Sequence, residues 1–141
     1  MPFEELQALA KKELEARSRL EYRVSVCTAA GCLSAGSGAV KDAFAKAVAA
    51  RGLGGSVQVV GTGCLGLCHA GPLLQVEKIG GETSLYHDLG PSDVPEIVES
   101  HLVEGRLVDR LLCPAGSPFF SRQKKIVLGN AGRIDPERIE D

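Results

Sequence analysis

The sequence predicts an α/β domain in which a parallel β–α–β unit is followed by an antiparallel β-hairpin and a closing helix. Two short runs rich in β-branched residues, YRVSVCT (22–28) and SVQVVG (56–61), flank one amphipathic helical stretch. Gly80 and Gly81 separate two further strand-like runs, as in a tight hairpin turn. A second amphipathic stretch follows Pro91. The expected order is therefore α-β-α-β-β-β-α, with a right-handed crossover between the parallel strands.

Each helix is expected from apolar residues that recur at helical spacing between capping signals. The middle helix has Ser34 or Ser37 as its candidate N-cap and Gly52 at its end, and the last helix has Ser92 or Asp93 and then Gly105. The apolar faces consist of Val40, Phe44, Ala47 and Val48 in the middle helix, and of Val94, Ile97, Val98 and Leu102 in the last one.

Two terminal segments flank this domain. An N-terminal amphipathic helix is expected from Pro2 to about Leu20. Its apolar face (Phe3, Leu6, Ala10, Leu14) is expected to pack on the domain, and the alternative is contact with a partner or a second copy. Beyond Leu112 the chain has prolines, glycines and charges but no long amphipathic pattern. We therefore expect three parts: the helix in 1–21, the domain in 22–112, and a linker or docking tail in 113–141.

Composition narrows the functional class. The chain has 141 residues, 44% of them hydrophobic, and a formal net charge of −2, which argues against nucleic acid or an anionic membrane as partner. No segment has the roughly 20 apolar residues of a membrane span, and the N-terminal sequence lacks the features of a signal peptide. The chain has five cysteines, an odd number, and in a reducing compartment cysteines at short spacings more often bind metal than form disulfides. A cytoplasmic metalloprotein is expected.

Four of the cysteines form two close pairs. Cys27 and Cys32 have four residues between them, and Cys64 and Cys68 have three, in the glycine-spaced run GTGCLGLCHAGP. Each pair follows a predicted parallel strand, and the carboxyl ends of such strands meet at one edge of the sheet. The four thiols are therefore expected to form one centre, in which glycines such as Gly63 and Gly66 let the backbone fold tightly and expose amide groups to sulfur.

The residues alone leave several chemistries open. Four thiolates can hold one zinc ion or a small iron–sulfur cluster, and pairs wider than C-x2-C favour the cluster. A thiol-disulfide enzyme would need a close redox pair, usually C-x-x-C, at the start of a helix. A cysteine nucleophile with His69 as its base would need two adjacent loop residues to face each other. The fifth cysteine, Cys113, is interpreted as a packed or free thiol, and His69 as solvated or as a group that tunes the centre.

The strand-end C-x4-C, the run TGCLGLCHAGP and the closing PSDVPEIVESHLVEGRLVDRLL resemble the thioredoxin-like 2Fe-2S ferredoxin family over about residues 22–112. That family includes the small 2Fe-2S subunit of respiratory NADH dehydrogenase. It also includes the N-terminal domain of the NADH-oxidising flavoprotein subunits of NAD-linked hydrogenases and formate dehydrogenases. The tail FFSRQKKIVLGNAGRIDPERIED resembles the lead-in to the flavin- and NADH-binding domain of those subunits.

The resemblance implies a thioredoxin-like fold and a 2Fe-2S cofactor bound by Cys27, Cys32, Cys64 and Cys68, with the first pair on one iron and the second on the other. It implies a one-electron carrier that serves an NADH-linked flavoprotein, hydrogenase or formate dehydrogenase, and a possible homodimer. The chain ends before any glycine-rich flavin or nucleotide loop, so neither an NADH site nor catalysis of its own is expected. The rival interpretations are a structural zinc-binding interaction module and a thiol-disulfide redox protein.

Overall fold

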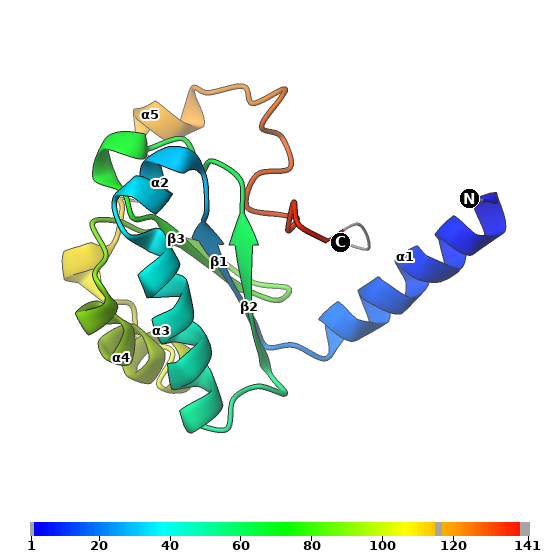
Figure 1. Ribbon diagram of the computed structural model, residues 1–141, viewed down its shortest axis with the longest axis horizontal. Coiled ribbons are helices and arrows are strands. Elements are labelled where there is room, and N and C mark those ends of the chain that lie inside the picture. Colours follow the sequence, from blue (N-terminus) through cyan, green and yellow to red (C-terminus); the bar gives the residue numbers. More distant parts are fainter. Residues whose placement is uncertain (1, 115–116, 139–141) are drawn as a thin grey trace.

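The computed structural model describes residues 2–114 and 117–138, and it contains a four-stranded mixed sheet with helices packed on it (Figure 1). The strand order is β2-β1-β3-β4, where β1 is Tyr22–Cys27, β2 is Val57–Thr62, β3 is Leu74–Lys78 and β4 is Thr83–Tyr86. Strands β1 and β2 run parallel, and β3 pairs antiparallel with both β1 and β4. The predicted parallel unit, hairpin and closing helix are confirmed.

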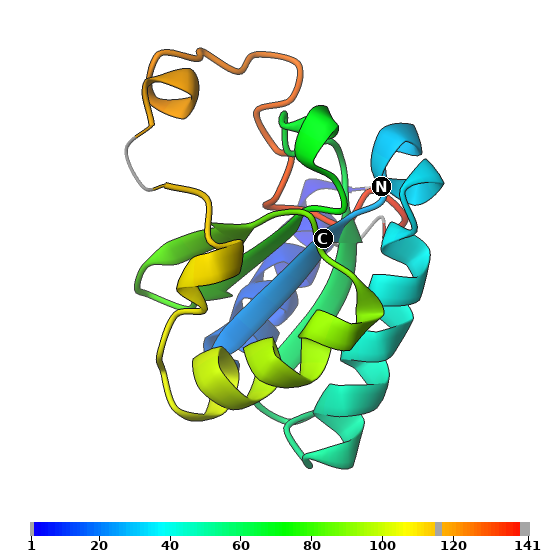
Figure 2. The same cartoon turned by 90° about the vertical axis from the view of Figure 1, so that its left-hand side faces the viewer.

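Helix α3 (Ser37–Ala50) and the closing helix lie side by side on one face of the sheet (Figures 1 and 2). Their apolar stripes meet the inward side chains of β1 and β3, so the core forms on this face. The predicted positions are buried: Val40, Phe44, Val48, Val94, Ile97, Val98 and Leu102, together with Val24, Val26 and Val76. Complete burial of each such aliphatic side chain contributes about 1.5–3 kcal/mol of transfer free energy.

The predicted helix caps are wrong in detail. Gly36, with a φ of 97°, precedes α3, because the chain must turn sharply there after an additional short helix, α2 (Ala30–Ser34). The closing helix begins as a 3-10 turn, η2 (Pro91–Asp93), continues as α4 (Val94–Ile97) and ends as a π-helix, η3 (Val98–Val103). Gly52 and Gly105 have the positive φ angles expected just after a helix.

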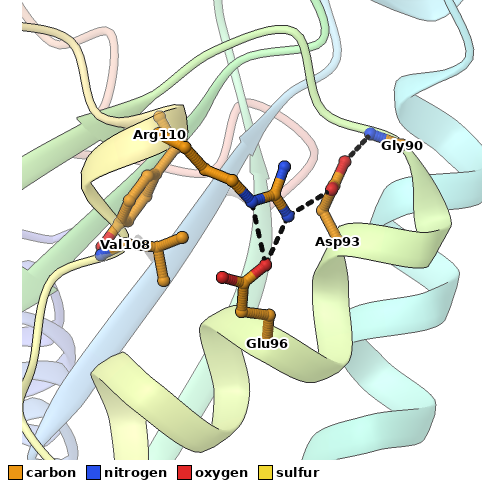
Figure 3. Close-up of polar contacts among 6 residues, drawn as sticks. Gly90, Asp93, Glu96, Val108 and Arg110 are labelled. Carbon is orange, nitrogen blue, oxygen red and sulfur yellow. Dashed lines mark hydrogen bonds and ion pairs between the residues drawn. The ribbon is translucent and has the colours of Figure 1, made fainter.

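Polar contacts fix the start of the closing helix. The Asp93 carboxylate accepts a hydrogen bond from the Gly90 N–H at 2.8 Å, and Arg110 donates to Asp93 at 2.7 Å and to Glu96 (Figure 3). Asp93 thus caps a preceding amide rather than the first turn of α4. The Gly90 amide, followed by Arg110, lowers the pKa of Asp93.

The side chains of Tyr86 and His101 meet in the core, where η3 packs on the sheet. The Tyr86 hydroxyl lies 2.8 Å from His101 Nδ1 and accepts a hydrogen bond from the Val108 N–H at 3.3 Å. Burial and the nearby Lys78 lower the pKa of His101. His101 is therefore a structural residue with a satisfied hydrogen bond.

The N-terminal helix α1 (Phe3–Ser18) projects away from the sheet (Figure 1) and has no buried residue. Its predicted packing against the domain is wrong: Phe3, Leu6 and Leu14 are exposed. Short alanines and charged residues separate these three side chains, so the apolar stripe is too thin to bury much area. No helix in the described ranges is long and apolar enough to span a membrane.

The tail packs on the second face of the sheet. It begins with a short helix, α5 (Pro118–Ser121), arches over the loop after β2, and returns along the sheet (Figure 1). The Gly132 N–H donates to Thr62 Oγ1 at 2.8 Å, and Gln75 donates to the Gly132 carbonyl at 2.9 Å. Asp135 is buried on this side. The last predicted tail residues, 139–141, and also 1, 115 and 116, lie outside the described residues.

Candidate metal centre

The first cysteine pair is delivered by the end of β1. Cys27 is the last residue of the strand, and its N–H donates to the Leu73 carbonyl at 3.0 Å. Cys32 lies in the middle of α2, a short helix that the sequence pattern did not predict. Because a helical turn returns the chain toward the strand end, Cys32 comes back beside Cys27. Both thiols are buried, at 0% and 1% exposure, among Leu65, Ala70 and Leu73.

The second pair lies in the loop that follows β2. Gly66, between the two cysteines, has a φ of 92°, a left-handed conformation that favours glycine. A short 3-10 turn, η1 (Cys68–Ala70), then closes the loop. Cys64 Sγ lies 3.4 Å from Cys68 Sγ. This second pair is partly exposed to solvent, whereas the first pair is buried.

Electrostatic interactions act between the two pairs as well as within each pair. Burial, followed by a hydrogen bond with the Cys27 side chain, raises the pKa of Cys32 to about 11, and the charge of Cys68 acts in the same direction. A hydrogen bond with Cys64 is the main cause that raises the pKa of Cys68, with a smaller effect from Cys27. The raised pKa values of Cys32 and Cys68 mean that these two thiols hold their protons more tightly than a free cysteine does, and a metal that binds them must displace those protons.

Close backbone packing surrounds the thiols. A Cβ at Gly71 would lie 3.0 Å from Cys32 Sγ and 3.5 Å from the Cys68 carbonyl, so only glycine fits without displacing that sulfur. A Cβ at Gly31 would meet Cys68 Cβ at 3.9 Å, an ordinary contact. The chain thus brings α2 and η1 together at the same edge of the sheet.

The geometry is that of two thiol pairs. Within residues 2–114 and 117–138, no three His, Cys, Asp or Glu side chains converge as a group that could hold a single cation. A tetrahedral metal with thiolate bonds of about 2.3 Å places two sulfurs about 3.8 Å apart. The 3.4 Å between Cys64 and Cys68 fits such a pair after a shift of a few tenths of an ångström.

The other candidate residues lie outside this group. Burial and the charge of Asp88 raise the pKa of Cys113, whereas the shifts at Cys32 and Cys68 come from other cysteines as well as burial. His69 is exposed beside Cys68, and His87 pairs with Asp88 at 2.6 Å. Lys125 reaches the second cysteine loop from the tail and donates to the Leu65 carbonyl at 3.4 Å, a contact that its place in the sequence did not predict.

Fold and site together define a small α/β protein of thioredoxin-like outline with a paired-thiol centre at the carboxyl edge of its parallel strands. Residues 12–101 match the family model described as thioredoxin-like 2Fe-2S ferredoxin. The chain belongs to that family, whose members are electron carriers that bind a 2Fe-2S cluster. The resemblance seen in the sequence and the predicted fold are confirmed.

Relatives and solved structures agree with this assignment. A 2Fe-2S ferredoxin of Clostridium pasteurianum is 33% identical over 99 residues, which cover 64% of this chain and 94% of the relative. A 2Fe-2S ferredoxin of Aquifex aeolicus (strain VF5) is 42% identical over 57 residues, covering 40% of this chain and 49% of that protein. A solved structure of a thioredoxin-like 2Fe-2S ferredoxin from Aquifex aeolicus superposes with a TM-score of 0.63 at 30% identity, covering 70% of this chain and 96% of the other.

Proposed function

We propose that this chain holds a 2Fe-2S cluster as a one-electron carrier, with Cys27 and Cys32 on one iron and Cys64 and Cys68 on the other. The observation that carries the proposal is the arrangement of the thiols as two neighbouring pairs, one of them with its sulfurs 3.4 Å apart. Two irons that each take two thiolates require this pattern. A single zinc ion would instead require four sulfurs around one point.

The protein would control the electron chemistry through burial and access. When bound, the cluster supplies a centre that accepts and releases one electron. The buried pair lies in an apolar pocket that excludes water, whereas the exposed pair faces solvent. Burial and hydrogen bonding around the sulfurs are established influences on cluster potentials. The exposed Cys64–Cys68 side is therefore the side through which electrons enter and leave.

Single cysteine-to-serine variants test the ligand assignment. Replacing Cys27, Cys32, Cys64 or Cys68 should reduce bound iron and alter the visible spectrum of anaerobically purified protein. The matched control is Cys113→Ser, which should leave both unchanged because burial and Asp88, with no contribution from another cysteine, raise the pKa of that thiol. An unchanged spectrum in any of the four variants, or cluster loss in the control, would contradict the assignment.

The same proposal extends to an electron partner. We infer that the chain exchanges electrons with an NADH-linked flavoprotein, hydrogenase or formate dehydrogenase, and the support is the resemblance of its tail to the lead-in of such flavoprotein domains. The test is anaerobic mixing with a purified NADH-oxidising flavoprotein subunit of an NAD-linked formate dehydrogenase. Addition of NADH should bleach the cluster only when the flavoprotein is present. Failure to bleach a cluster that dithionite reduces would argue against this partner class.

A further inference from the structure

A basic and apolar surface, here called the tail patch, lies on the arch of the tail. It consists of Arg122, Lys124, Lys125, Ile126 and Val127, all exposed, and Ile126 and Val127 have exposed fractions of 80% and 95%. Residues 117–134 contain four basic side chains and no acidic one, although the whole chain has a net charge of −2. The patch is therefore positive on a protein that is otherwise negative.

The tail patch lies against the exposed half of the thiol centre. Lys125 Nζ donates to the Leu65 carbonyl at 3.4 Å, within the loop between Cys64 and Cys68. A Cβ at Gly66 in the same loop would lie 3.8 Å from both Lys125 Nζ and the Gln123 side-chain oxygen. Charge on the tail is thus next to the thiols that face solvent.

The arch is anchored to the domain beyond the patch. Gly132 donates its N–H to Thr62 and accepts from Gln75, so the tail is tied to the ends of β2 and β3. Thr62 also donates from its hydroxyl to the Ile134 carbonyl at 3.2 Å. These contacts hold a segment whose apolar side chains Ile126 and Val127 remain in water. The fold thus keeps an apolar surface exposed beside its redox centre.

We propose that the tail patch is the docking surface for the acidic face of a partner redox protein. Positive charge attracts such a face and speeds encounter, and exposed aliphatic side chains supply the apolar centre of an interface. Docking there brings the partner over the Cys64–Cys68 side, where one electron passes from the reduced protein of the pair to the oxidised one. This inference rests on the proposed function, because it requires a redox-active centre at the four cysteines.

The chain offers a matched control for the charge. Lys11 and Lys12 form a second exposed lysine doublet on α1, which projects away from the cysteine edge (Figure 1). Their helix also carries Glu4, Glu5, Glu13 and Glu15, so this doublet lies among negative charges. Reversing both lysines of either doublet changes the net charge equally.

The experiment uses two small oxidants of opposite charge. Protein reduced by dithionite and freed of excess reductant is mixed with hexacyanoferrate(III), which takes one electron to become hexacyanoferrate(II), or with hexaamminecobalt(III), a trication that also takes one electron. In about 10 mM salt, where the Debye length is about 30 Å, Lys124→Glu with Lys125→Glu should slow the anionic oxidant about tenfold or more and speed the cationic one. The double variant Lys11→Glu with Lys12→Glu should change the rate with either oxidant less than about threefold, because these two charges lie far from the cysteine edge.

Two additions make the result decisive. Lys124→Glu alone avoids the Lys125 contact with the cysteine loop, and it should give a smaller change of the same sign. Poly-L-glutamate, used as an acidic polypeptide, should slow hexacyanoferrate oxidation of the wild type but not of the double variant. If the two double variants change the oxidation rates equally, or if neither changes them, the docking proposal is wrong. The proposed function would still stand in that case, provided that the protein holds a visible cluster. Protein without a dithionite-bleachable cluster would overturn both.

Discussion

Adding one methyl group at Gly71 should weaken cluster binding while leaving the fold intact. The new Cβ would lie 3.0 Å from Cys32 Sγ, compared with the 3.4–4 Å of ordinary contacts. A thiol without metal can rotate away, but a sulfur bound to iron cannot, so the strain falls on the loaded state. Overpacking of this kind costs about 1–3 kcal/mol, which corresponds to about a 5- to 150-fold change.

The assay follows the loss of visible absorbance after an iron chelator is added to anaerobic protein. Gly71→Ala should lose its cluster faster than wild type by about that factor. The control is Gly31→Ala, whose Cβ would meet Cys68 Cβ at 3.9 Å in a helix that tolerates alanine. Equal half-lives for Gly71→Ala and wild type would refute the packing around Cys32, and rapid loss in both variants would show that the effect is not specific to that sulfur.

Three further predictions concern stability. Gly132→Ala places a Cβ 2.6 Å from the Gln75 side-chain oxygen at a φ of +87°, so the tail should become sensitive to limited proteolysis, and unchanged protection would contradict its anchoring. Burial lowers the pKa of His101 below its ordinary 6.5, so the unfolded chain binds more protons and stability should fall as pH drops below that value. His101→Phe should reduce the fall in Tm between pH 7.5 and 5.5, and an identical fall in the variant would refute the linkage. Asp93→Ala should lower Tm by a few degrees, from the loss of about 1 kcal/mol at the Gly90 amide, and an unchanged Tm would contradict that role.

The sheet and the grouping of the cysteines could be predicted from the sequence because both depend on local patterns. Val24, Val26 and Val76 alternate with residues on the opposite face of the sheet, as a strand requires, and all three are fully buried. Cys27 ends one parallel strand and Cys64 follows the other, and the carboxyl ends of neighbouring parallel strands lie at one edge of the sheet whatever the conformation of the loops. The ligand roles of the cysteines remain a prediction, as do the domain limits and the electron partner.

The short helix around Cys32 and the packed tail could not be predicted in the same way. Helix α2 has five residues, AGCLS, too few for an amphipathic period, and no side chain caps its start. The tail is held by single contacts through Thr62, Gln75 and the backbone of Gly132, which leave no apolar repeat in the sequence. At α1 the sequence pattern predicted packing that the structure lacks. Apolar residues recur there at helical spacing, but nothing in the described structure covers Phe3 or Leu14.

The central claim is tested most directly by counting iron and acid-labile sulfide in protein purified without air, with low-temperature paramagnetic resonance after dithionite reduction. The thiol pairs at Cys27–Cys32 and Cys64–Cys68 predict about two irons and two sulfides per chain and one unpaired spin in the reduced state. One zinc per chain with no visible absorbance would contradict the account and make this a structural zinc module.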